Sequence, residues 1–104
     1  MAQFDVYENE DPDSREVIPF LLDLQHDLHS NLSTRTVVPL VRVFSATEVP
    51  RHLCPKFRID DKDVFMSTPE MAGYPAADLR TRVMSLSGRR TEILAAVDFL
   101  LTGF

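Results

Sequence analysis

The densest group of side chains capable of chemistry lies between residues 23 and 30. His26 and His29 are potential bases, Asp23 and Asp27 are potential orienting acids, and Ser30 is a potential nucleophile. These residue types match a nucleophilic hydrolase site, in which a base takes the hydroxyl proton and an acid orients the base. In a β-strand, however, the two histidines project from opposite faces, so they meet only if the strand ends between them. We therefore interpret the segment as an exposed strand end and expect no catalytic residue in it.

Other segments carry metal-binding residue types without the spacing that metal sites need. His52 and Cys54 supply two potential zinc ligands, whereas a structural zinc site needs about four, so Cys54 is better explained as a buried, inert thiol. Residues 60–63 lack the central glycine and the final glutamate of a calcium loop, which favours a solvated hairpin tip. The three glycines are too far apart to form a phosphate-binding loop. We predict neither a metal site nor a cofactor.

Alternation of apolar and polar residues predicts the strands that position these side chains. Residues 3–7 alternate around Phe4 and Val6, and residues 8–16 are acidic with turn-forming residues, which predicts a short strand followed by an exposed loop. Residues 18–27 alternate most clearly. One face of that strand is expected in the core, and it comprises Ile18, Phe20, Leu22 and Leu24.

The middle of the chain predicts further strands. Residues 36–44 are nearly continuous in Val and Leu, as in a strand covered on both faces, and Pro39 requires an edge or bulge because it lacks an N–H. Residues 45–48 have capping-box spacing and predict one helical turn. Residues 57–66 predict a hairpin with a four-residue turn, and residues 68–77 an irregular strand.

The end of the chain predicts an amphipathic helix that runs into an apolar tip. Its apolar residues follow helical spacing from Thr91 onward, and Ser87 is the expected N-cap: the positions are Ile93, Leu94, Val97, Leu100 and Leu101. Gly103 allows the chain to turn after the helix and to present Phe104 in a defined direction. Such a tip either packs on the fold or serves a partner. Several short strands and one terminal helix favour a small, curved antiparallel sheet or barrel with the helix on one face.

Composition limits the function further. A length of 104 residues with 44 % hydrophobic and 26 % charged residues fits one globular domain over residues 1–104. The net charge of −5 repels a phosphate backbone, so we expect no direct nucleic-acid binding. The single cysteine and the absence of a signal-like start favour the cytoplasm. No apolar run approaches the roughly 20 residues of a membrane-spanning helix.

Six short motifs occur in order along essentially the whole chain. They are Gln3-Phe4-x-Val6-Tyr7, Asp23-Leu24-Gln25-x-Asp27, Arg35-x-Val37-Val38-Pro39-Leu40, Leu53-x-Pro55, Met71-Ala72-x-x-Pro75 and the end of the helix. In these motifs the chain resembles the CcdB family of plasmid-maintenance toxins. The resemblance implies a mainly β fold with a C-terminal α-helix, an SH3-like small antiparallel barrel of the CcdB/MazF type, assembled as a homodimer.

The resemblance also implies a function and its residues. Such toxins bind the A subunit of DNA gyrase and trap its complex with cleaved DNA, without covalent chemistry by the toxin. The gyrase-facing positions would be Leu28, His29, Asp98, Leu101, Thr102, Gly103 and Phe104. A cognate CcdA-like antitoxin would neutralise the toxin and repress the operon with it, making the DNA contacts itself. Its expected contact edge is the acidic loop, with Glu8, Asn9, Glu10, Asp11, Asp13 and Arg15.

One departure from the family pattern keeps two alternatives open. Family members often carry Trp-Gly plus an aliphatic residue near the end, where this chain has Thr102-Gly103-Phe104. Loss of a large aromatic anchor weakens an interface, so one alternative is a homologue that binds antitoxin but no longer poisons gyrase. The other is a MazF-like ribonuclease on the same fold, which would need a basic RNA groove with a positioned acid and base.

Overall fold

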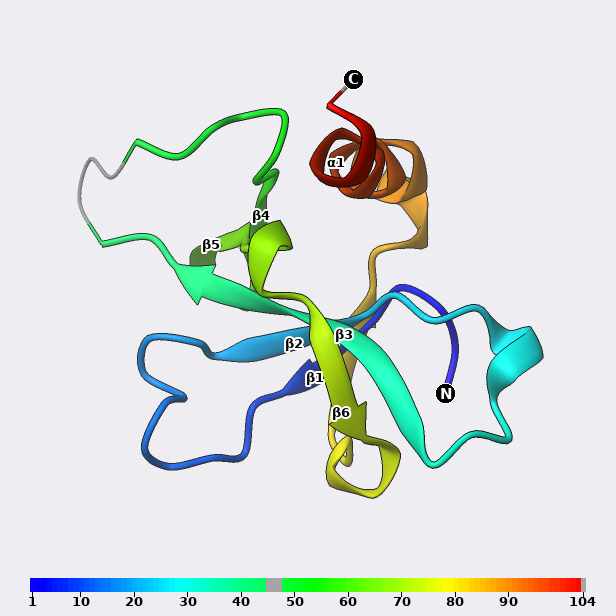
Figure 1. Cartoon of the computed structure of the whole chain (residues 1–104). Helices are drawn as coiled ribbons and strands as arrows, with labels where there is room; N and C mark the ends of the chain where they lie inside the picture. Colours follow the sequence, from blue (N-terminus) through cyan, green and yellow to red (C-terminus); the bar gives the residue numbers. More distant parts are fainter. Residues whose placement is uncertain (45–47, 104) are drawn as a thin grey trace.

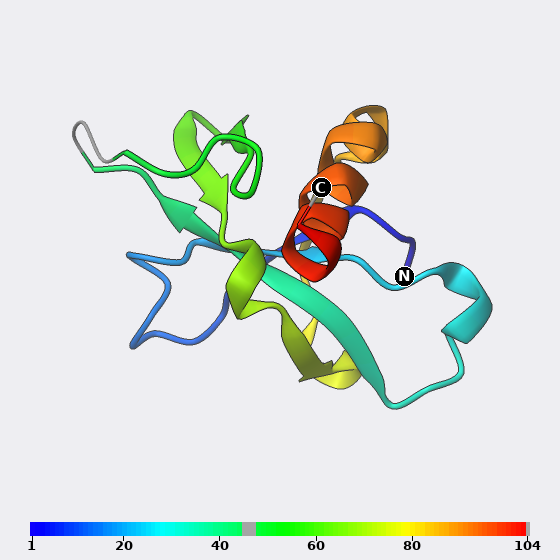
Figure 2. The same ribbon diagram turned by 45° about the horizontal axis from the view of Figure 1, so that its top comes forward.

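The computed structural model describes residues 1–44 and 48–103, which form one curled antiparallel sheet with a helix across one face (Figures 1 and 2). The strand order is β4-β5-β3-β2-β1-β7, and β6 pairs with β3 beside β5. The strands are β1 (Asp5–Glu8), β2 (Phe20–Asp23), β3 (Thr34–Arg42), β4 (Lys56–Ile59), β5 (Lys62–Met66), β6 (Ala72–Pro75) and β7 (Arg82–Ser85). Helix α1 spans Arg90–Thr102. This arrangement confirms the predicted mainly β fold with a C-terminal helix.

Strand β3 is the longest strand and organises the sheet. It pairs with β2 on one side, and on the other side its first half pairs with β6 and its second half with β5. Pro39 lies on β3 between Val37, which pairs with β6, and Leu40, which pairs with β5. The Pro39 carbonyl accepts the Ser67 N–H at 3.0 Å. The missing N–H of Pro39 therefore falls at a gap between neighbouring strands, as the sequence predicted.

Both faces of the sheet bury apolar side chains. On the face covered by α1, the fully buried Ile93 and Ala96 pack in one cluster with Phe20 and Leu22. On the opposite face, the smaller cluster contains Tyr7, Leu21, Val37 and Leu79. The expectation that only one face of the second strand is core is therefore wrong, because Leu21 on the other face is buried in this smaller cluster, which Leu79 from the segment before β7 helps to form.

Several predicted boundaries differ from the structure. The strand expected over 18–27 is limited to Phe20–Asp23, since Pro19 precedes it and a 3₁₀ turn, η1 (Asp27–His29), follows. In the β4–β5 hairpin only Asp60 and Asp61 form the turn, with φ of 49° and 63°, because Lys62 and Asp63 already pair with β4. Residues 68–77 contain β6 between two 3₁₀ turns, η2 (Thr68–Glu70) and η3 (Ala76–Asp78). The helical turn expected over 45–48 falls largely on residues 45–47, outside the described residues.

The start of the C-terminal helix also differs. Ser87 is not its N-cap: Ser87–Arg89 form a 3₁₀ turn, η4, and the Ser87 N–H donates to the Ser85 hydroxyl at 3.1 Å. Arg89 occupies the cap position of α1 without a side-chain cap hydrogen bond. Its guanidinium instead pairs with Glu92 at 2.6 Å and stacks over Phe57. These two contacts offset the unfavourable position of a cation at the start of a helix.

Candidate functional site

The last turns of α1 form the most exposed apolar part of the helix. Ile93 and Ala96 are fully buried, whereas Leu101 keeps 68 % of its surface exposed. Gly103 closes the helix in the left-handed region at φ 78°, and its N–H donates to the Phe99 carbonyl at 2.9 Å. The predicted glycine C-cap is thus confirmed. Up to Gly103 the helix end stands away from the core, and Phe104 lies outside the described residues.

A largely apolar groove separates α1 from the segment that follows β2. Its volume is about 490 Å³. It is lined by Leu24, Gln25, His26, His29, Leu32, Thr36, Met71, Leu94 and Val97. Leu94, Val97 and Leu101 follow one another at the spacing of one helix face. The helix wall of the groove therefore continues to the exposed Leu101.

The η1 turn forms the opposite wall of this groove. Leu28 at its centre is 78 % exposed, and its N–H donates to His26 Nδ1 at 3.0 Å. The sequence-based statement that His26 and His29 lie on opposite strand faces does not apply, because β2 ends at Asp23 before either residue. Both imidazoles line the same groove. Of the predicted partner-binding set, His29 therefore lines the groove whose other wall is α1, whereas Leu28 is exposed on the same turn and is not among the lining residues.

The polar side chains of this turn are engaged in local backbone contacts. Asp27 Oδ1 accepts the Gln3 N–H at 2.7 Å, and the Ser30 hydroxyl donates to the Asp27 carbonyl at 2.5 Å. Neither histidine, within the described part of the chain, shares a hydrogen bond with a carboxylate. Nor do residues 1–44 and 48–103 hold a group of three or more His, Cys, Asp or Glu side chains suited to a metal ion. The nucleophile, base and acid considered from the sequence are thus not linked to one another.

A buried ion pair lies directly behind the turn. Arg35 Nη2 is 2.6 Å from Asp23 Oδ2, and the two side chains are 1 % and 0 % exposed. Burial raises the pKa of the Asp23 carboxyl, because desolvation of the charged form outweighs its hydrogen bonds with Arg35 and the Gln25 N–H and the attraction of the guanidinium. Arg35 also donates to the Gln25 carbonyl at 3.0 Å. The pair therefore connects β2, β3 and the start of the loop.

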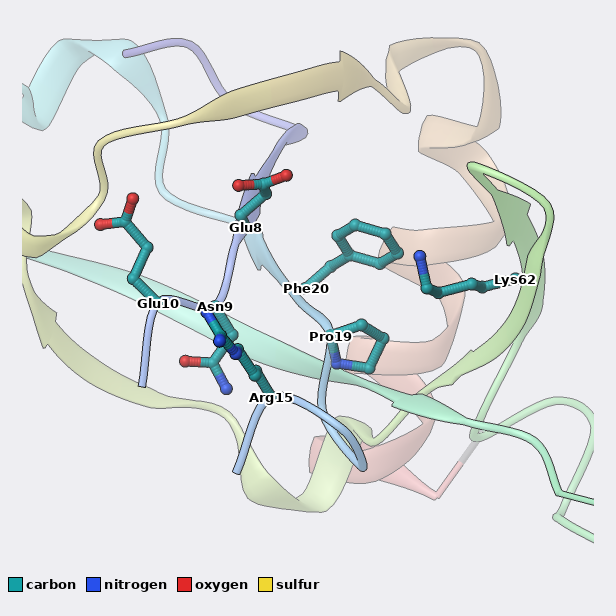
Figure 3. A pocket seen from close by; sticks show the side chains of 7 residues that line it. All are labelled: Glu8, Asn9, Glu10, Arg15, Pro19, Phe20 and Lys62. Atoms are coloured by element: carbon teal, nitrogen blue, oxygen red, sulfur yellow. The ribbon is translucent and has the colours of Figure 1, made fainter. Parts of the chain in front are cut away.

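The acidic loop lies on a different side of the molecule from η1 and α1 (Figures 1 and 2). Asn9 is buried and organises the loop, since its side-chain amide donates to the Ser14 hydroxyl and the Ile18 carbonyl. The other predicted contact residues are exposed: Glu8, Glu10, Asp11, Asp13 and Arg15. The loop borders a groove of about 380 Å³ in which the Lys62 ammonium lies 5.7 Å from the centre of the Phe20 ring (Figure 3).

The sequence matches a protein-family model over nearly its whole length. The family model described as CcdB protein matches residues 3–103. The chain belongs to the CcdB family. As a CcdB-family protein it is the toxin component of a toxin–antitoxin system. The match extends from the first strand to the glycine cap of α1, so it includes both sides of the groove. The described residues contain no helix long and apolar enough to cross a membrane.

The CcdB fold brings together residues that are far apart in the sequence and share no local pattern. Leu32 and Met71 join the groove from the loop before β3 and from the residue just before β6, which are distant along the chain. A second groove of about 550 Å³ lies between α1 and the segment before β4, and it is lined by Arg51, His52, Glu92, Ala95 and Phe99. No local pattern marks these residues, because their proximity depends on how α1 packs on the sheet.

Replacing Gly103 tests how the cap directs the chain end. An added Cβ would meet no atom within 4 Å, so the cost of Gly103→Ala comes from the left-handed backbone, about 1–2 kcal/mol. We expect lower thermal stability of α1 and weaker killing of sensitive cells by the induced toxin. Gly103→Asn is the matched control, because asparagine tolerates this conformation better. Equal effects of Ala and Asn on stability and killing would contradict the proposed role of the cap.

Cys54 provides a test of how tightly the segment before β4 is packed. Its thiol is buried, and burial raises the pKa of the thiol despite an opposing backbone hydrogen bond at Thr68. Because the thiolate is the reactive form, we expect Cys54 to react with Ellman's reagent at least about a hundredfold more slowly in the folded protein than in urea. Because the pKa of the Cys54 thiol is raised, the reaction of the folded protein should accelerate only at pH values above those at which an exposed cysteine ionises. Equal rates in buffer and in urea would show that the site is open.

Proposed function

We propose that this CcdB-family toxin binds the A subunit of DNA gyrase and traps the gyrase complex with cleaved DNA. The observation that supports this most directly is the exposed apolar end of α1, where Leu101 keeps 68 % of its surface accessible at the margin of the groove. Family membership supplies the class of protein, and this surface supplies a place where a partner can bury apolar area. Since gyrase acts on the chromosome, we place the toxin's action in the cytoplasm.

The proposed gyrase-facing residues form two exposed elements. Leu28 and His29 belong to η1, Asp98, Leu101 and Thr102 belong to the end of α1, and Gly103 caps that helix. Phe104, the last proposed residue, lies outside the described residues. Burial of a leucine as exposed as Leu28 or Leu101 stabilises a complex by about 1.5–3 kcal/mol. The Thr102 hydroxyl donates to the Asp98 carbonyl at 2.7 Å, so this side chain is bonded to its own helix. The apolar contribution therefore rests on Leu28, Leu101 and Phe104.

Poisoning by this route requires no bond-making by the toxin. A protein that binds the cleaved state of gyrase more tightly than the resealed state shifts that equilibrium toward cleavage by its difference in affinity. A rigid helix end is suited to this role, because it presents a fixed shape to only one of two arrangements of the partner. The toxin is then a selective binder of one gyrase conformation and needs no cofactor.

Control of the toxin would use other surfaces. We propose that the chain forms a homodimer and that a CcdA-like antitoxin contacts the acidic loop through exposed Glu8, Glu10, Asp11, Asp13 and Arg15, with Asn9 holding the loop in shape. A disordered antitoxin segment can cover a large area and is readily removed by proteolysis. The toxin carries a net charge of −5, so DNA contacts in operon autorepression would come from the antitoxin.

A gyrase cleavage assay tests the proposal directly. Purified toxin is incubated with gyrase, ATP and supercoiled plasmid, and linear DNA is measured after denaturation and protease treatment. The expected result is accumulation of linear DNA that depends on both the toxin and gyrase. A parallel incubation with total RNA tests the ribonuclease alternative. Linear DNA at background levels with RNA degraded would favour a ribonuclease, and no effect on either substrate would favour a homologue that has lost poisoning.

A further inference from the structure

The loop of residues 25–30 is exposed and is held almost entirely by polar contacts. None of the three residues of η1 is buried, so apolar packing does not fix its shape. Leu28, in the middle of this turn, has the highest exposed fraction among the large hydrophobic residues of the described chain. A short turn with so little packing would normally be mobile, because ordering each residue costs conformational entropy. Its geometry therefore depends on its hydrogen bonds.

Arg35 provides a buried anchor for these bonds. Its guanidinium is 1 % exposed and makes four contacts: Nε and Nη2 donate to Asp23 Oδ2, Nη2 donates to the Gln25 carbonyl at 3.0 Å, and Nη1 donates to the Ser30 hydroxyl at 3.4 Å. Two of these contacts join β3 to β2. The other two reach the first and last residues of the 25–30 loop.

The Ser30 hydroxyl connects the Arg35 guanidinium to the η1 turn. It receives the Arg35 Nη1 hydrogen bond and donates to the Asp27 carbonyl at 2.5 Å. Gln25 adds a second tie, since its side-chain amide donates to the His29 and Thr34 carbonyls while its oxygen accepts the Thr36 N–H at 3.0 Å. Both ends of the loop are thereby fixed to β3, and Leu28 is carried between them.

We propose that Arg35 is a positioning residue that fixes the 25–30 loop and so presents Leu28 to the partner of the toxin. A planar guanidinium reaches Asp23, Gln25 and Ser30 at once, which a lysine ammonium on a flexible stem does not do. If Arg35 only joined two strands, it would need its contacts with Asp23 and none with the loop. That the partner is gyrase rests on the function proposed above, whereas the restraint on the loop does not.

The test combines a measure of loop order with a measure of binding. Arg35→Lys keeps a positive charge near Asp23 but removes the planar guanidinium. Ser30→Ala removes the Arg35–Ser30 hydrogen bond together with the Ser30–Asp27 hydrogen bond and leaves the buried pair intact. Ser33→Ala is the matched control, since this neighbouring serine makes no side-chain hydrogen bond to any described residue. Order parameters of the backbone amides of residues 26–30 are measured by ¹⁵N relaxation, and affinity for a gyrase A fragment by calorimetry.

We expect the order parameter of Leu28 to fall from about 0.85 to below about 0.6 in Ser30→Ala, with binding weakened about tenfold and Ser33→Ala unchanged in both. Arg35→Lys should have a larger effect, and Ser30→Thr, which keeps the hydroxyl, should restore order and affinity. If Arg35→Lys does not fold, the Ser30 variants decide the matter.

Each remaining result also gives an answer. Unchanged loop order in Ser30→Ala and Arg35→Lys would overturn the proposal whatever the binding data show. A mobile loop with undiminished affinity would overturn it as well, because the order would then not serve the partner. If the wild-type toxin fails to bind the gyrase fragment, the proposed function fails, and the order parameters alone judge whether Arg35 positions the loop.

Discussion

Deletion of Thr102, Gly103 and Phe104 is expected to abolish killing while leaving the folded toxin intact. The helix is anchored by Ile93 and Ala96, both fully buried, which precede the deletion by about 2.5 and 1.7 helical turns. The deleted residues are exposed as far as Gly103, so the core loses little. A central interface anchor contributes about 2 kcal/mol or more, which is roughly a thirtyfold loss of affinity. Killing is measured by colony counts after induction.

Three measurements make this result interpretable. Circular dichroism and size-exclusion chromatography should show an unchanged fold and dimer, and purified antitoxin should still be captured. Asp61→Asn, at the tip of the β4–β5 hairpin, is a control for a change at an exposed site away from α1. A gyrase-mutant strain shows whether death depends on gyrase. Continued killing by the truncated toxin would exclude the helix end as the effector surface.

Removal of the carboxylate in Asp23→Ala is expected to cause the largest loss of stability. It leaves the guanidinium of Arg35 buried without its counter-charge, and breaking a buried pair in this way typically costs about 3–5 kcal/mol. Urea denaturation followed by circular dichroism measures the loss as a lower transition midpoint. The effect should be similar at low and high salt, because the pair is shielded from solvent ions.

The matched control for this prediction is Asp63→Ala. Asp63 pairs with Arg58 at 3.0 Å, but both side chains are 63 % exposed, and such surface pairs contribute at most about 1 kcal/mol. The two variants remove the same group from pairs of similar geometry and opposite burial. Comparable losses in both would show that burial of the Asp23–Arg35 pair carries no special energetic weight.

The sequence predicts those features that depend on local periodicity. The hairpin at 57–66, the amphipathic C-terminal helix and the glycine cap at Gly103 are confirmed, because each is specified by residues close together in the chain. Pro39 also indicates its own position, since the missing N–H restricts it to an interruption in the ladder. The family model agrees with the fold that the motifs imply.

Features that depend on tertiary contacts were not predictable in the same way. The strand from residue 18 ends early because Arg35 and Gln25 fix a turn after Asp23, and alternation alone continues through that turn. The groove combines residues from η1, β3, α1 and the segment between η2 and β6, so no single window of sequence contains its pattern. One signal was present: Asp23 ends an otherwise apolar strand, and a charged residue at such a position is rarely buried unless it is paired.

The interruption at Pro39 also restricts how the sheet can be assembled. Sliding β3 by two residues would keep its apolar side chains on the same faces, so hydrophobicity alone does not reject that arrangement. Such a slide would move Pro39 out of the break between β5 and β6 and into a hydrogen-bonded position of the ladder. Because proline has no N–H, a backbone carbonyl of the neighbouring strand would then lack its hydrogen-bond donor. Pro39 thus restricts the register of the longest strand, and through that register it keeps Arg35 within reach of Asp23, whose partner across the ladder is Val37.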